Sequence, residues 1–149
     1  MELDEFLIKA KTGTYASNGE ASEQRLPDGS LELTYCEGEF SYRDRYFGFD
    51  PFSGQEIVFK EGKAIWSMNY YGRTVDKKFP AEEIYAFLQK ALRQVTLVRP
   101  FRGPSIFAEG DFMYNDESSG TLENFSGAER ILSNRHKVYT LKYHGGTIK

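Results

Sequence analysis

The sequence predicts an α+β domain in which a curved, mostly antiparallel sheet of about seven strands carries two main helices. Three observations favour this fold class. Two segments have apolar residues at helical spacing, several others alternate apolar and polar residues, and short glycine-containing stretches connect the alternating segments. The expected order is one helix, four strands, one helix and three strands. Connections of hairpin length favour antiparallel pairing because parallel strands need a longer crossover.

The two helices are expected at the start and in the middle of the chain. The first begins near Leu3 and ends before Gly13, with acidic residues in its first turn and lysines in its last, as the helix dipole favours. The second begins after Pro80. Its apolar stripe comprises Ile84, Phe87, Leu88, Ala91, Leu92 and Val95. We expect this stripe to pack across the sheet.

The strands are expected where the alternation is clearest. The segments concerned are 31–36, 40–46, 57–59, 64–71, 111–117, 121–132 and 136–144. Turns are expected at 61–62, 118–120 and 133–135, where glycine, serine and asparagine gather. We expect one domain over residues 1–149, a mobile polar loop over 17–30, and no internal repeat.

The composition excludes several classes of protein. The chain has 149 residues, of which 28% are charged and 40% apolar, as is typical of a folded domain. Its net charge of −3 argues against nucleic-acid and membrane-surface partners. The single Cys36 excludes an internal disulfide, and the two histidines lack metal-site spacing, so we expect no metal and no cofactor. Without a signal peptide or a run of about 20 apolar residues, we expect a cytoplasmic protein.

Aromatic residues, at 15% of the chain, supply the first candidates for a binding site. Trp66 and Tyr42 offer flat surfaces for stacking, and Asn69 and Tyr71 offer hydrogen-bonding groups. The alternative is that Trp66 packs in the core with its neighbours on the same strand face. Alternation places Trp66 and Asn69 on opposite faces, so only a bulge would bring both to one site.

Three ionisable residues are candidates for proton transfer or for ligand charge. Asp44 shares a strand face with aromatic residues, where desolvation would raise its pKa and suit it to acid–base chemistry. Its alternative is a structural role, bonded to a tyrosine or paired with an arginine. Arg102, in a loop with two prolines, could bind an anionic group or tie down that loop. His144, at the end of the last expected strand, carries an imidazole that could serve as acid, base or hydrogen-bond donor, although a lone histidine near a terminus often has no role.

Several segments together resemble a known family. They are FLIKAK at 6–11, TYA at 14–16, LTY at 33–35, GEFSYRD at 38–44, FSGQE at 52–56, WSMNYYG at 66–72, FRGP at 101–104 and YHGG at 143–146. The set resembles a bacterial domain of unknown function, found as stand-alone proteins of about this length and behind Xre-type helix-turn-helix regulators. The resemblance carries no site residue. Its fused members imply a sensing or interaction role.

Three functions remain open on the sequence alone. The first is a binding or sensing domain for a small polar or anionic molecule, held in an aromatic-lined pocket by Tyr42, Trp66, Asn69, Tyr71 and Arg102. The second is a metal-independent enzyme that uses Asp44 or His144 as acid or base. The third is a protein-interaction module with an exposed aromatic patch, for which a homodimer is one arrangement.

Overall fold

The computed structural model describes residues 1–14 and 23–149, an α+β structure in which two helices lie on a large, open antiparallel sheet. Within these residues the sheet has nine strands. The elements are α1 (Leu3–Thr12), β1 (Glu23–Arg25), β2 (Leu31–Glu37), β3 (Phe40–Gly48), β4 (Phe52–Lys60), β5 (Lys63–Thr74), α2 (Ala81–Leu92), β6 (Ile106–Glu109), β7 (Phe112–Thr121), β8 (Asn124–Ser133) and β9 (His136–Thr147). The predicted fold class and both predicted helices are confirmed.

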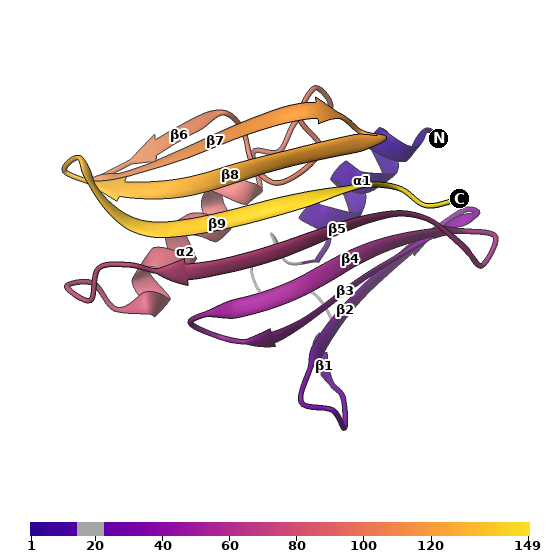
Figure 1. The fold of residues 1–149 in the computed structure, drawn as a ribbon, viewed down its shortest axis with the longest axis horizontal. Coiled ribbons are helices and arrows are strands. Elements are labelled where there is room, and N and C mark those ends of the chain that lie inside the picture. The colour runs from indigo at the N-terminus through magenta and orange to yellow at the C-terminus, as the bar shows by residue number, and fades with distance from the viewer. Residues whose placement is uncertain (15–22) are drawn as a thin grey trace.

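Two meanders meet at the centre of the sheet. The strand order is β1-β2-β3-β4-β5-β9-β8-β7-β6, so the first five strands are neighbours in chain order. After β5 the chain passes through α2 to the far edge of the sheet at β6. It then returns strand by strand to β9, which pairs with β5 (Figure 1). All neighbouring strands pair antiparallel.

The two meanders belong to the two halves of an internal repeat, contrary to the expectation that the sequence contains none. The first half is α1 with β2–β5, and the second is α2 with β6–β9. The matching segments are EGEFSYRD (37–44) with EGDFMYND (109–116), FSGQE (52–56) with FSGAE (125–129), and FLIKA (6–10) with FLQKA (87–91). Strand register agrees as well, since Asp44 lies opposite Glu56 and Asp116 lies opposite Glu129. The matches are short and widely separated, so local periodicity does not show them.

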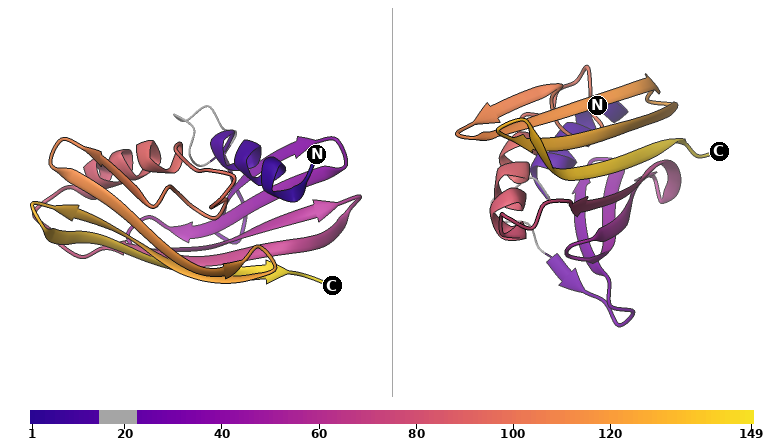
Figure 2. Two further views of the ribbon diagram at one scale, coloured as in Figure 1. Left: turned by 90° about the horizontal axis from the view of Figure 1, so that it is seen from above. Right: turned by 60° about the vertical axis from the view of Figure 1, so that its left-hand side comes forward.

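Both helices lie on the concave face of the curved sheet (Figure 2). Side chains that point to this face are buried, whereas alternate residues on the other face are more exposed. The core therefore forms between the helices and the concave face. The expected stripe of α2 is buried there, from Ile84 to Leu92. Neither helix in the described part of the chain is long and apolar enough to span a membrane.

The expected count of about seven strands is wrong because β1 and β6 were missed. These strands have three and four residues, and most of their side chains are exposed. Each lies at an edge of the sheet with a strand on one side only. A strand that short and that exposed shows no clear alternation of apolar and polar residues.

Two loop predictions are also corrected. The turn expected at 118–120 is absent, because β7 continues to Thr121. Of the loop expected over 17–30, residues 17–22 lie outside the described residues and 23–25 form β1. The turn expected at 61–62 is confirmed, with φ angles of 49° at Glu61 and 80° at Gly62.

Candidate functional site

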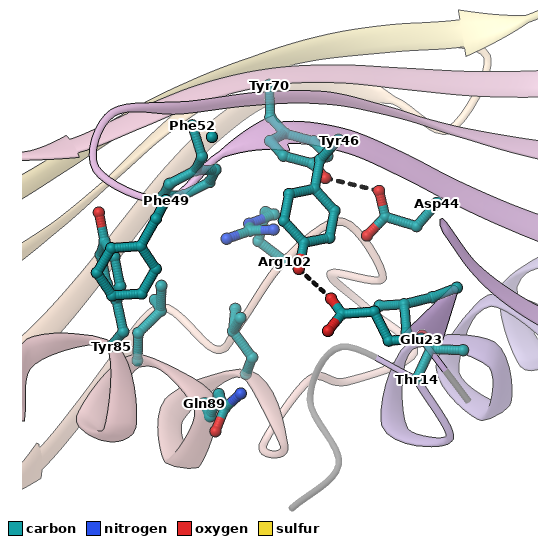
Figure 3. Close-up of a pocket in the computed structure, with 14 residues that line it drawn as sticks. Thr14, Glu23, Asp44, Tyr46, Phe49, Phe52, Tyr70, Tyr85, Gln89 and Arg102 are labelled. Atoms are coloured by element: carbon teal, nitrogen blue, oxygen red, sulfur yellow. Dashed lines mark hydrogen bonds between the residues drawn. The ribbon is translucent and has the colours of Figure 1, made fainter. Parts of the chain in front are cut away.

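A cavity of about 490 Å³ lies on the concave face, between the strands of the first half and α2. Side chains from β1, β2, β3, β4, β5 and α2 line it, with Arg102 reaching in from the loop before β6 (Figure 3). Its size is that of a pocket for a small organic molecule. In the second half, residues of the loop before β6 pack against the strands. There Phe101 stacks on Phe125 with ring centroids 4.3 Å apart.

One wall of the cavity is aromatic. Phe49, Phe52 and Tyr85 pack edge to face, with Tyr85 5.1 Å from Phe49 and 5.7 Å from Phe52 between ring centroids. Phe49 is 54% exposed and lies at the rim. Tyr85 is held in place because its hydroxyl donates to Asp50 at 3.0 Å. These rings offer an apolar surface with π faces next to the open space.

The opposite side of the cavity holds a buried carboxyl group. Asp44 is 3% exposed, and its Oδ1 accepts a hydrogen bond of 2.6 Å from the hydroxyl of Tyr70 (Figure 3). Asp44 is on β3 and Tyr70 on β5, so this bond passes over β4. Gly54 of β4 leaves space for the Tyr70 side chain to cross that strand, because a Cβ atom there would lie 2.5 Å from Cζ of Tyr70.

The environment of Asp44 favours its neutral form. Burial raises the pKa of its carboxyl group to about 7, and the nearby charge of Glu56 adds to the rise. The Tyr70 hydrogen bond lowers the pKa, as do the positive charges of Arg102 and Lys11, and together they only partly offset the burial. Near neutral pH this group therefore exchanges between a hydrogen-bond donor and a carboxylate.

Arg102 is buried and balanced by Glu129. Its Nη2 and Nε donate to the two carboxylate oxygens of Glu129 at 2.6 and 3.2 Å, a bidentate pair. Glu129 also accepts hydrogen bonds from the hydroxyls of Tyr114 and Tyr139, at 2.6 and 2.8 Å. The guanidinium carbon lies 5.5 Å from the ring centroid of Tyr70. Arg102 thus forms part of the cavity wall with its charge already compensated.

A second ion pair lies behind the cavity, between α1 and β4. Nζ of Lys11 lies 2.5 Å from Oε1 of Glu56, and both side chains are fully buried. Burial lowers the pKa of Lys11, while the attraction of Glu56 opposes this effect. At the rim, the hydroxyl of Tyr46 donates to Glu23 of β1 (Figure 3). That contact joins the short edge strand to the wall of the cavity.

The second half repeats the tyrosine–aspartate contact with one difference. The hydroxyl of Tyr143 donates to Asp116 at 3.0 Å, again across a glycine, Gly127, of the strand between them. Burial raises the pKa of Asp116 to about 7. Here, however, an arginine completes the site, since Nη2 of Arg99 lies 3.1 Å from Oδ2 of Asp116.

Residues 44–148 match the family model of a domain of unknown function, DUF5680. The chain belongs to this family. The match begins at Asp44 and includes Tyr70, α2 and Arg102, so it spans most of the cavity, whereas α1, β1 and β2 precede it. No curated protein and no solved structure matches the chain.

Of the residues singled out in the sequence, Asp44 and Arg102 lie at the cavity. Trp66 and Tyr42 lie in the core, at 0% and 1% exposure. The Trp66 ring stacks on Phe125 at 5.6 Å, and its Nε1 donates to the Leu122 carbonyl at 3.0 Å. The structure therefore gives these two aromatic residues packing positions outside the cavity.

Asn69, Tyr71 and His144 lie on the other face of the sheet. Asn69 pairs in register with His144 and accepts a hydrogen bond from Gln55 at 2.9 Å, while Tyr71 is 52% exposed. The alternation that placed Trp66 and Asn69 on opposite faces is confirmed, because β5 has no bulge between them. The structure does not bring these three residues together with Asp44.

Sequence reasoning did not select several residues that line the cavity. These are Glu23, Tyr46, Phe49, Phe52, Tyr70, Tyr85 and Gln89. Alternation places Tyr46 on the strand face of Asp44 and Tyr70 on that of Trp66, but it does not show which of these side chains reach the cavity and which lie in the core. The described residues hold no group of three His, Cys, Asp or Glu side chains that could bind a metal ion.

Proposed function

We propose that this protein binds a small polar molecule in the cavity beside Asp44. The observation that supports the proposal is the combination, in one space of about 490 Å³, of an aromatic wall with two buried polar side chains, Asp44 and Arg102. Apolar walls of this kind contribute affinity, and a few convergent polar groups orient the ligand. A buried carboxyl group carries a desolvation cost that a ligand hydrogen bond or charge offsets.

We further propose that this binding serves to sense the small molecule in the bacterial cytoplasm. The resemblance to domains that follow Xre-type regulators supports it, since such domains suit detection of a small molecule. The connection between α1 and the strands of the cavity suits it too, because Lys11 of α1 pairs with Glu56 of β4. A ligand charge beside Asp44 would therefore change the electrostatic energy of the Lys11–Glu56 pair.

A fragment screen by ligand-observed NMR tests the proposal, with mixtures of small aromatic amines, carboxylates and alcohols. The Gln89→Trp variant serves to block the site. Gln89 lies at the cavity on α2 and is exposed, so a larger side chain there occupies the space without disturbing the core. Gln94→Trp is the matched control, because Gln94 is exposed and outside the cavity.

We expect fragments that bind the native protein and Gln94→Trp but not Gln89→Trp. The bound fragments should also raise the melting temperature, since ligand at 100 times its Kd adds about 2.7 kcal/mol of stability. Absence of any bound fragment, or equal binding to both tryptophan variants, would contradict the proposal.

Catalysis at the same cavity is a second candidate, favoured by the Asp44 carboxyl group. A pKa of about 7 suits a general acid or base at neutral pH, and the group is within reach of a bound molecule. Each bound fragment is therefore incubated with the native protein and with Asp44→Asn, and followed by mass spectrometry. Conversion by the native protein alone would support an enzyme, and no conversion would leave binding as the function.

A further inference from the structure

We infer that the ligand of this cavity is an organic cation, a protonated amine or guanidine on an apolar group, whose charge lies against Asp44. The inference rests on the proposed function and adds the chemical class of the ligand. Its main support is the internal repeat, which shows what the equivalent aspartate binds in the other half.

Asp116 corresponds to Asp44 in the repeated motif and has the same surroundings. Each carboxyl group is buried, lies opposite a glutamate on the next strand, and accepts a hydrogen bond from a tyrosine two strands away. Asp116 also binds a cation, the guanidinium group of Arg99, which donates to its Oδ2 at 3.1 Å and to its backbone carbonyl at 2.9 Å. The protein itself thus provides an example of a cation held by this arrangement.

Asp44 lacks this cation. In the described part of the chain, no Lys, Arg or His nitrogen lies within 4.0 Å of its carboxylate. Residues 15–22 contain no Lys, Arg or His, so they do not supply one either. The two nearest buried cations are each paired with a glutamate, Lys11 with Glu56 and Arg102 with Glu129. A ligand is the remaining source of a positive charge.

The charges of the residues that line the cavity also favour a cationic ligand. Its ionisable acids and bases are Glu23, Asp44 and Arg102, and the charge of Arg102 is balanced by Glu129. The cavity is therefore negative when Asp44 is ionised. An anionic ligand would face two carboxylates and compete with Glu129 for the arginine, whereas a cation is attracted to both acids.

The aromatic wall suits the same ligand. Phe49, Phe52 and Tyr85 present rings to the space across from Asp44 (Figure 3). The faces of such rings attract ammonium and guanidinium groups, and their edges and faces bury the attached apolar group. The site thus combines a carboxylate with aromatic surfaces, as cation-binding sites require.

Binding of a cation is expected to release a proton from Asp44. The groups that face Asp44 are Glu56 of β4, Tyr70 of β5, Lys11 of α1 and Arg102 of the loop. Burial and the charge of Glu56 favour the protonated carboxyl group, whereas the other three groups favour the carboxylate. A ligand cation favours the ionised carboxylate. Affinity should therefore rise with pH up to about 7, approaching tenfold per pH unit on the acid side, and level off above it.

Three indoles that differ in side-chain charge test the inference by isothermal titration calorimetry. They are tryptamine (cation), tryptophol (neutral) and indole-3-acetate (anion), measured at pH 6 and pH 8. Asp44→Asn removes the proposed partner. Asp116→Asn is the matched control, since it changes the equivalent aspartate of the other half, which does not line the cavity. Titrations of the native protein at pH 6 in phosphate and in MES, which both buffer at that pH, count the released protons without any variant.

We expect tryptamine to bind at least tenfold more tightly than tryptophol at pH 8, with the ratio falling at pH 6. Asp44→Asn should abolish this preference, Asp116→Asn should keep it, and the native protein should release a proton at pH 6. Tightest binding of indole-3-acetate, or a cation preference unchanged by Asp44→Asn, would overturn the inference but leave the binding function intact. Failure of all three indoles, when fragments of the first screen bind, would overturn it too. An empty first screen would instead reject the proposed function.

Discussion

Tyr70 and Tyr143 are register partners at the centre of the sheet, where the two halves of the repeat meet. Each tyrosine donates its hydroxyl to an aspartate two strands away in its own half, Asp44 or Asp116. In both halves the strand between the tyrosine and the aspartate carries a glycine, which leaves space for the tyrosine side chain to cross that strand. One arrangement is therefore used twice, with Arg99 completing it in the second half and a cavity beside it in the first.

Replacing the glycine beneath Tyr70 should disturb the site. In Gly54→Ala, the new Cβ would lie 2.5 Å from Cζ of Tyr70, so the ring that donates to Asp44 must shift. We expect a loss of about 1–3 kcal/mol in the free energy of unfolding, as for other overpacked positions. Urea denaturation measures it, with exposed Ser53→Ala on the same strand as the control. A loss equal to that of the control would show that the ring does not need the glycine.

Removing the tyrosine hydroxyl should raise the pKa of Asp44 above its value of about 7. The hydrogen bond from Tyr70 lowers that pKa because it stabilises the carboxylate. Tyr70→Phe keeps the ring and removes the donor. Carboxyl ¹³C NMR titration measures the shift, and Tyr143→Phe should affect Asp116 and leave Asp44 unchanged. An Asp44 pKa that stays constant or falls in Tyr70→Phe would contradict the assignment.

Breaking the buried Lys11–Glu56 pair should strongly destabilise the protein. Lys11→Met leaves the Glu56 carboxylate buried without its ion-pair partner, for which we expect a loss of about 3–5 kcal/mol. The double variant Lys11→Met/Glu56→Leu should recover much of that loss, because it removes both charges. Chemical denaturation of the two single variants and the double variant forms the cycle. Additive losses would mean that the pair is not coupled.

The raised aspartate pKa values predict how stability changes with pH. Between about pH 4 and pH 7 the folded protein holds a proton on Asp44 that the unfolded chain has released. This group therefore lowers the free energy of unfolding as pH rises, by up to about 1.4 kcal/mol per pH unit. Asp44→Asn should lose this contribution, so its stability relative to the native protein increases from pH 5 to pH 7. Urea titrations at each pH measure the difference, and a decrease would contradict the pKa shift.

The sequence predicted those parts of the site that depend on local pattern. Alternation along β3 placed Asp44 on the buried face, and the helical spacing of α2 identified the stripe that covers the sheet. Two prolines correctly indicated a loop around Arg102. The same alternation indicated that Asn69 would face away from Trp66.

The parts that escaped prediction depend on contacts between distant segments. The Tyr70–Asp44 bond spans 26 residues of sequence and depends on strand register and on Gly54, which no local pattern reveals. The Arg102–Glu129 pair likewise joins two segments that are separate in the sequence, the loop before β6 and strand β8. The edge strands β1 and β6 are too short for alternation, and they form because a neighbouring strand offers hydrogen bonds.

The most direct test of a cation site beside Asp44 is a two-dimensional ¹H–¹³C NMR titration of the aromatic side chains with tryptamine. We predict that the ring signals of Phe52, Tyr70 and Tyr85 shift in a saturable way, because these rings line the cavity. Tyr71, exposed on the opposite face, should not shift. Shifts confined to Tyr71 and its neighbours on that face, or no saturable shift at the cavity, would contradict the account.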